Sequence, residues 1–170
     1  MKNKHTKLLC ISAIFSALVF VTTAYLHIPT YNGYVHCGDG FIFLAACMLP
    51  TPYAVVIAIL GATLADLLTG FAIWAPGTMV VKGLLVLLFC YKSNKIVTKR
   101  NLTMLLPATL ISTVVYYFYE VLITGSFTAS LSGIPGSLIQ AVASSAVYIV
   151  AGIAMDKYNV KTKLLDDYNK

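Results

Sequence analysis

The sequence predicts an all-α integral membrane protein, and its composition, its mean hydropathy and its long apolar segments all support this fold class. Of its 170 residues, 59% are hydrophobic and 11% are charged, and the mean hydropathy is +0.83. Soluble domains carry about 25% charged residues, so this chain has too few of them to cover a surface in contact with water. We therefore expect a single membrane domain over residues 1–170, with no soluble domain.

Six apolar segments account for this domain. A helix that crosses the hydrocarbon core needs about 20 mostly apolar residues. The predicted segments are 8–26, 40–50, 52–69, 76–91, 102–123 and 134–155. Segment two is short, because its eleven residues rise only about 16 Å, about half of a core ~30 Å thick. We expect it to be either a half-span or a helix at the thin edge of the bundle.

The basic residues predict the orientation of these segments. All of them except Lys82 lie in three groups: before segment one (Lys2, Lys4 and Lys7), between segments four and five (Lys92, Lys95, Lys99 and Arg100) and after segment six (Lys157, Lys161, Lys163 and Lys170). The positive-inside rule places both termini and the 92–101 loop in the cytoplasm, which an arrangement of six transmembrane helices allows. The net charge of +6 is expected to face anionic lipid headgroups, so it requires no nucleic-acid partner.

Polar side chains within the segments are the main indication of function. A charged side chain costs roughly 2.5–3.5 kcal/mol at the centre of a bilayer, so such residues usually have a role. Asp66, Lys82, Glu120 and Gln140 lie in four different segments and all fall in the outer third, and Asp39 lies at the outer start of segment two. This shared depth predicts a cavity that opens to the outside.

Each of these side chains also has a simpler interpretation. Asp39 could cap the helix that follows it, and Lys82 could extend to the outer headgroups. Asp66 and Glu120 could be solvated at the interface, or either could be the counter-ion of Lys82. Gln140 could donate a hydrogen bond to a neighbouring helix. The sequence leaves these alternatives open.

Aromatic side chains gather at the same level. The set comprises Tyr31, Tyr34, Phe41, Trp74, Tyr116, Tyr117 and Tyr119. It is either an interfacial belt or, in part, the walls of the cavity, which would suit a small heteroaromatic molecule with hydroxyl or amine groups. The loop 29–38 contains Pro29, Gly33 and Gly38, and we expect it to act as a lid over the mouth of the cavity.

No motif for catalysis or for a cofactor is present. The set His27, His36, Cys37 and Asp39 matches no known metal-ligand spacing, so we expect neither a metal nor a cofactor. The sequence has no HExxH, GxSxG or P-loop motif, so the chain is not expected to be an enzyme or to hydrolyse ATP itself.

Small residues in segment one indicate close helix packing. Ser12 and Ser16 form one pair at i, i+4 spacing, and Ala13 and Ala17 form another on the adjoining face. Such pairs let helix backbones approach closely in lipid. The contact is either with a partner protein or within the bundle, and the spacing does not decide between the two.

Several motifs, in order along nearly the whole chain, resemble a known family. They are GYVHCGDGFIFLAA at 33–46, ADLLTG at 65–70, WAPGT at 74–78, KGL at 82–84, Tyr119-Glu120 and IPGSLIQ at 134–140. The chain is similar to S components of energy-coupling factor (ECF) transporters, in the branch that includes riboflavin, hydroxymethylpyrimidine and pyridoxine carriers. It departs from that branch at Cys37, where Leu is common, and at Ser137, where Asn is frequent.

The resemblance implies a six-helix subunit of the bacterial cytoplasmic membrane that binds a small vitamin or vitamin precursor and releases it inside the cell. It implies partners, a membrane coupling protein (the T component) and two cytoplasmic ATPases, with Ala13 and Ala17 contacting the coupling protein. The residues expected to contact the substrate are Tyr34, His36, Asp39, Trp74, Lys82, Glu120 and Gln140.

The alternative function is a stand-alone secondary transporter or channel. Asp66, Lys82 and Glu120 would then form a proton relay. The lack of polar residues in the inner third of the segments argues against such a path, because a relay has to continue to the other side of the membrane.

Overall fold

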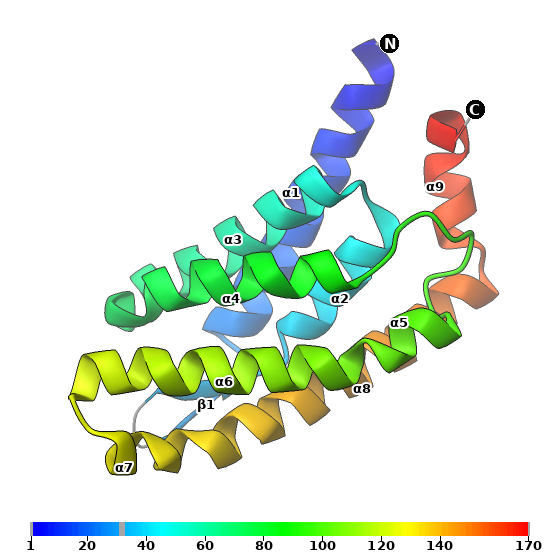
Figure 1. The fold of residues 1–170 in the computed structure, drawn as a ribbon. Coiled ribbons are helices and arrows are strands. Elements are labelled where there is room, and N and C mark those ends of the chain that lie inside the picture. Colours follow the sequence, from blue (N-terminus) through cyan, green and yellow to red (C-terminus); the bar gives the residue numbers. More distant parts are fainter. Residues whose placement is uncertain (1, 31–32, 170) are drawn as a thin grey trace.

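The computed structural model describes residues 2–30 and 33–169, and it is a bundle of helices (Figure 1). The helices that correspond to the six predicted segments are α1 (Lys2–Ala24), α2 (Asp39–Met48), α3 (Thr51–Leu68), α4 (Ala75–Leu88), α6 (Leu105–Thr124) and α8 (Ile134–Lys157). Four helical stretches among the described residues are long and apolar enough to cross a membrane: Lys4–Ala24, Thr51–Leu68, Lys99–Thr124 and Phe127–Lys157. Because α2 and α4 are shorter, the six crossings and the cytoplasmic termini stay predictions.

Short elements that the sequence did not predict join and extend these helices. They are the 3₁₀ helices η1 (Ala72–Trp74) and η2 (Leu131–Gly133) and the helices α5 (Lys99–Thr103), α7 (Phe127–Ser130) and α9 (Val160–Asn169). The fifth segment therefore begins earlier than predicted, at a helix start where the Thr98 side chain accepts a hydrogen bond from the Asn101 N–H. At the other end of α6, Gly125 adopts a φ of +68°, a left-handed conformation that glycine accepts without steric cost and that ends the helix.

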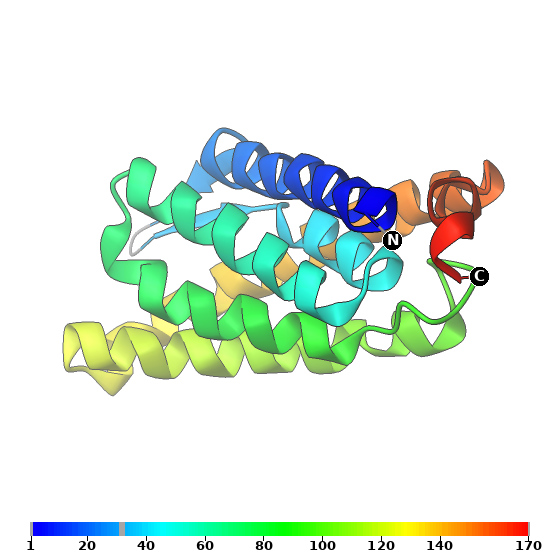
Figure 2. The same ribbon diagram turned by 90° about the horizontal axis from the view of Figure 1, so that it is seen from above.

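The bundle has two distinct ends. Both termini lie at one end, beside the loop 89–98 that connects α4 to α5, and we call this the inner end (Figures 1 and 2). The described residues 25–30 and 33–38 and the connections 69–74 and 125–133 lie at the opposite, outer end (Figure 2). All basic residues except Lys82 belong to the segments at the inner end. This arrangement agrees with the charge distribution on which the predicted orientation rests.

The short helix α2 lies in the middle of the bundle, so one of the two alternatives for segment two, a helix at the thin edge, is wrong. Every residue of α2 except Phe41 is buried, and the helix packs against α1, α3, α4 and α8. The approach to α8 is close, because a Cβ atom on Gly40 would lie 2.7 Å from the carbonyl oxygen of Ser144. A helix surrounded by protein does not need to match the thickness of the lipid, which explains why segment two can be short.

A small β-hairpin overlaps the predicted lid 29–38 and begins two residues before it, so the fold is not entirely helical. Strand β1 (His27–Pro29) pairs antiparallel with β2 (Tyr34–His36), with His27 opposite His36 and Pro29 opposite Tyr34. Tyr31, one of the predicted aromatic residues, lies outside the described residues. The hairpin packs against α8 through β2 and against α1 through β1, and so it covers the outer end between these two helices.

The two pairs of small residues on α1 have different surroundings. A Cβ atom on Gly61 of α3 would lie 2.8 Å from the carbonyl oxygen of Ser16, so the Ser12–Ser16 face packs closely on α3. Ala13 and Ala17 are both exposed. Packing within the bundle thus accounts for the serine pair, and it leaves the alanine pair on the surface.

Polar side chains bind the backbone of the irregular loop at the inner end, and we call Asn101, Asp156 and Lys161 the inner polar cluster. The fully buried Asn101 donates to the carbonyl oxygens of Cys90 (3.3 Å) and Ile96 (3.1 Å) and accepts from the Cys90 N–H (3.1 Å). The sequence alone predicts no hydrogen-bonding role for these three side chains.

The two charged members of the inner polar cluster act in the same way. The carboxylate of Asp156 accepts hydrogen bonds from the N–H groups of Ile96 (2.8 Å) and Val97 (2.9 Å). The ammonium of Lys161 donates to the carbonyl oxygens of Cys47 and Ser93, each at 2.6 Å, and to that of Tyr91. Burial lowers the pKa of Lys161. These contacts fasten α9 and the loop 89–98 to the inner end of α2.

Candidate functional site

A cavity of about 420 Å³ extends from the hairpin into the bundle. Its walls come from the hairpin, α2, α3, α4, α6 and α8. Six of the predicted substrate contacts line it: Tyr34, His36, Asp39, Trp74, Glu120 and Gln140. The seventh, Lys82, is fully buried and is not among the lining residues.

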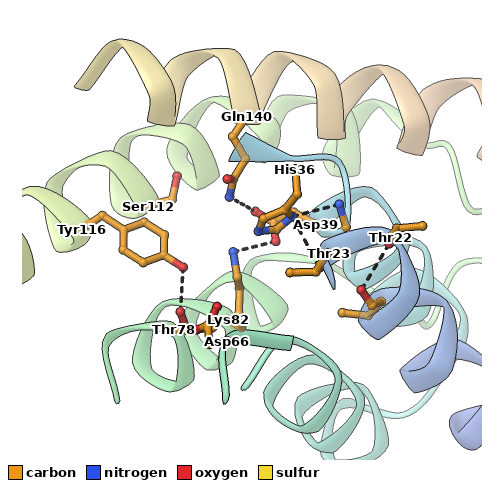
Figure 3. A network of polar contacts seen from close by, with 12 residues as sticks. Thr22, Thr23, His36, Asp39, Asp66, Thr78, Lys82, Ser112, Tyr116 and Gln140 are labelled. Carbon is orange, nitrogen blue, oxygen red and sulfur yellow. Dashed lines mark hydrogen bonds and ion pairs between the residues drawn. The ribbon is translucent and has the colours of Figure 1, made fainter. Parts of the chain in front are cut away.

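Asp39 is the centre of a buried polar group that joins three helices (Figure 3). The ammonium of Lys82 on α4 forms an ion pair with Asp39 Oδ1 at 2.7 Å, and Nε2 of Gln140 on α8 donates a hydrogen bond to Oδ2 at 3.0 Å. Asp39 makes no side-chain cap to α2, and the full burial of Lys82 excludes an extension to the headgroups. Asp39 is therefore the counter-ion of Lys82. The depth of the residues in the bundle had suggested Asp66 or Glu120 for this role.

A second polar group faces the cavity from α3 and the hairpin. The hydroxyl of Tyr34 donates to Oδ1 of Asp66, and burial, reinforced by Asp66, raises the pKa of Tyr34 above its usual value, which keeps the phenol a proton donor. Thr78 lies beside Asp66, and its hydroxyl is 3.3 Å from that of Tyr116 (Figure 3). This chain of contacts ties the hairpin to α3, α4 and α6 around the mouth of the cavity.

Glu120 lines the cavity from α6 near its outer end. Its side chain is only 3% exposed. It lies against Gly133 at the start of α8, so closely that a Cβ atom on Gly133 would overlap the carboxylate. The lack of a side chain at position 133 is therefore what leaves room for a buried carboxylate here.

Aromatic rings form one wall, as one of the two interpretations of the aromatic set predicts. Trp74 lies 6.1 Å from Tyr116 and 6.0 Å from Tyr119, measured between ring centroids. The ammonium of Lys82 lies 5.4 Å from the centroid of the Tyr116 ring. The hydroxyl of Tyr119 donates to the carbonyl oxygen of Ile73 at 2.7 Å and so holds α6 against η1.

His36 closes the cavity at the base of the hairpin. Its Nδ1 atom accepts a hydrogen bond from the N–H of Gly38 at 3.1 Å and lies 3.5 Å from the hydroxyl of Thr23 on α1. Burial is the largest cause that lowers the pKa of His36 to about 4, and the nearby Asp39 opposes this shift. His36 is therefore neutral at pH 7 and holds the hairpin through its acceptor nitrogen.

We expect the stability of the protein to fall as the pH is lowered from about 6.5, the usual pKa of histidine, towards about 4. Protonation of Nδ1 would turn an acceptor that faces the Gly38 N–H into a donor, so the folded state resists the proton that the unfolded chain accepts. Thermal unfolding in detergent at a series of pH values measures this effect. The variant His36→Asn, which keeps an acceptor at the same distance from the backbone, should lose that part of the pH dependence. An equal pH dependence in both proteins would contradict the assignment to His36.

Three small polar residues that the sequence did not single out also line the cavity: Thr109, Ser112 and Ser145. Thr109 and Ser112 precede Tyr116 and Glu120 at intervals of three or four residues, so the four lie on one face of α6. With Ser145 on α8, Thr109 and Ser112 extend the cavity towards the inner end with small hydroxyl groups. Counting back in helical steps from Glu120 would have found them.

The residues His27, His36, Cys37 and Asp39 match no metal-ligand spacing in the sequence, and two of them have other partners in the structure. Within residues 2–30 and 33–169, no three side chains of His, Cys, Asp or Glu lie in a group that could hold a metal ion. The Nδ1 atom of His36 accepts a hydrogen bond from the Gly38 N–H. The carboxylate of Asp39 forms an ion pair with Lys82 and accepts a hydrogen bond from Gln140.

Known proteins resemble this chain both in sequence and in fold. A family model described as "ECF-type riboflavin transporter, S component" matches residues 3–157. A solved structure of the S component of a bacterial ECF transporter superposes with a TM-score of 0.73 at 21% identity, over 91% of this chain and 98% of that one, which shows that the two share a fold. A search of curated protein sequences finds no match.

Proposed function

Because this chain belongs to the family of S components of ECF-type riboflavin transporters, we propose that it captures a small heteroaromatic vitamin or vitamin precursor in the cavity beneath the hairpin. As a member of that family it is a substrate-binding membrane subunit rather than an enzyme. The substrate would belong to the riboflavin, hydroxymethylpyrimidine or pyridoxine class. A T component and two cytoplasmic ATPases would drive its release on the cytoplasmic side of a bacterial cell membrane.

The observation that carries the proposal is the composition of the cavity wall. The volume of about 420 Å³ lies in the range of about 300–1,000 Å³ that is usual for small-molecule sites. Such sites combine apolar and aromatic walls with a few convergent polar groups. Here Trp74 and Tyr116 supply flat surfaces, and Asp39, Gln140 and Asp66 supply polar groups from three different helices.

The six cavity-lining residues named above are proposed substrate contacts, and Lys82 is proposed to act through Asp39. Because Lys82 does not line the cavity, its effect on a ligand would come from holding the Asp39 carboxylate in place. The alternative of a proton relay through Asp66, Lys82 and Glu120 gains no support from this geometry, since the ammonium of Lys82 is engaged by Asp39.

Co-expression with a bacterial T component and its two ATPases tests the proposal. A tag on this chain should recover all four subunits in one complex from the membrane, and mass spectrometry of the chain purified alone should detect a retained small heteroaromatic molecule. Uptake of a substrate by vesicles that contain only this chain, and its collapse on addition of a protonophore, would instead support the secondary transporter. The lack of a complex with any co-expressed module would contradict the proposal.

A further inference from the structure

The charge of the cavity wall is unbalanced towards the negative. The chain has six acidic residues, and three of them, Asp39, Asp66 and Glu120, line the cavity. No Lys or Arg is found among the described residues that line it. By sequence, eleven of the twelve basic residues lie outside the six apolar segments, and Lys82 is the one within them.

The positive charge of Lys82 is already balanced. Its ammonium is fully buried and lies 2.7 Å from Oδ1 of Asp39, and Oδ2 of the same carboxylate accepts from Gln140. The group of Asp39, Lys82 and Gln140 is therefore neutral as a unit. The other two acidic side chains of the wall are those of Asp66 and Glu120.

Asp66 shows where a ligand could add a contact. Its side chain is 3% exposed, and the Tyr34 hydroxyl binds only Oδ1. Oδ2 is buried and accepts no hydrogen bond from the residues that the structure describes. A buried carboxylate oxygen without a donor is costly, and a ligand that brings a donor and a positive charge removes this cost.

The aromatic wall also favours a cation. The indole of Trp74 and the ring of Tyr116 face the same cavity as Asp66 and Glu120. The faces of Trp and Tyr rings attract ammonium groups, most strongly where water is excluded. The ring of Tyr116 already has the ammonium of Lys82 at 5.4 Å from its centroid.

Given the proposed function, on which this step rests, we infer that the cavity selects a cationic heteroaromatic amine over neutral and anionic molecules of the same size. The positive group of the ligand would lie between the carboxylate of Asp66 and the rings of Trp74 and Tyr116, with Glu120 adding to the negative potential. A preference for positive charge distinguishes candidate substrates from one another, because a flavin is neutral and a protonated aminomethyl compound is a cation.

Pairs of probes that differ by one functional group test the inference. One pair is pyridoxamine and pyridoxine, and the other is the aminomethyl and the hydroxymethyl form of 4-amino-2-methylpyrimidine, with pyridoxal phosphate as the anionic probe. An alkylamine is protonated at pH 7, whereas a hydroxyl is neutral. Trp74 is the single tryptophan of the chain and lines the cavity, so its fluorescence reports binding in a direct titration. We expect each amine to bind at least about tenfold more tightly than its hydroxyl partner.

Two isosteric variants locate the charge that is responsible. Asp66→Asn should weaken binding of the amines about tenfold more than it weakens binding of the hydroxyl compounds, and Glu120→Gln should do the same to a smaller extent. The ratio of the two affinities is the readout, and thermal unfolding in detergent is the control for folding. An amine that binds no more tightly than its hydroxyl partner, tighter binding of pyridoxal phosphate, or no binding of either amine would overturn the inference. Recovery of the four-subunit complex does not depend on these titrations, so the proposed function and the charge preference can fail separately.

Discussion

Replacement of Lys82 with methionine is expected to lower the stability of the protein by about 3–5 kcal/mol and to weaken substrate binding at least about tenfold. Methionine fills much of the space of the lysine stem but leaves the Asp39 carboxylate buried without its cation. An unpaired charge in a buried site is strongly destabilising. Thermal unfolding in detergent gives the stability, and titration with the molecule that the purified protein retains gives the affinity.

The double variant Lys82→Met, Asp39→Asn is the matched control. It removes both charges and keeps an amide that can accept the hydrogen bond from Gln140, so stability should return to within about 1–2 kcal/mol of the original. If Asp39 contacts the substrate, affinity stays low in the double variant although the fold is restored. A single variant Lys82→Met as stable as the unaltered protein would show that the ion pair does not have the importance assigned to it.

Replacement of Ala17 with tryptophan is expected to abolish recovery of the complex with the coupling protein and the ATPases while leaving substrate binding unchanged. Ala17 is exposed on α1, on the face that does not pack against α3, so a large side chain there should not disturb the bundle. It would, however, prevent a second helix from approaching the Ala13–Ala17 pair closely. Pull-down of the co-expressed subunits and a ligand titration on the same preparation measure the two effects.

Val142→Trp is the control for this variant, because Val142 is also apolar, lies on α8 and is 71% exposed. This control should retain the complex. Loss of the complex in both variants would mean that a bulky surface residue disrupts assembly in general. Recovery of the complex with Ala17→Trp would show that the alanine pair does not belong to the interface.

The sequence predicted the helices well because apolar length and prolines are local properties. Pro52, Pro76 and Pro135 each lie at the second residue of a helix, where a missing N–H costs little. The position of α2 was not predictable in this way. A ten-residue helix that is apolar after its first residue, Asp39, is equally compatible with the edge and with the centre of a bundle, and only its contacts with four other helices decide.

The level of the site was predictable, but its pairings were not. Depth along a helix follows from counting residues, so the polar residues could be assigned to one level of the bundle. The direction in which a side chain points around the helix axis relative to its neighbours depends on packing. Depth therefore suggests Asp66 or Glu120 as the counter-ion of Lys82, whereas the structure pairs Lys82 with Asp39.

The hairpin and the inner polar cluster had weak signals in the sequence. Strands of three residues are too short to show an alternating pattern, so His27–Pro29 and Tyr34–His36 resembled a loop. Asn101 and Lys161 lie beyond the apolar segments and resembled ordinary water-exposed residues, yet both are buried against backbone groups.

The inner polar cluster also bears on how this protein could diverge in sequence. Its three side chains bind N–H and carbonyl groups of the loop 89–98, and almost every amino acid carries these groups. The shape of the loop therefore depends little on which amino acids occupy it. The loop residues could therefore change while the loop keeps its shape, provided that Asn101, Asp156 and Lys161 are kept.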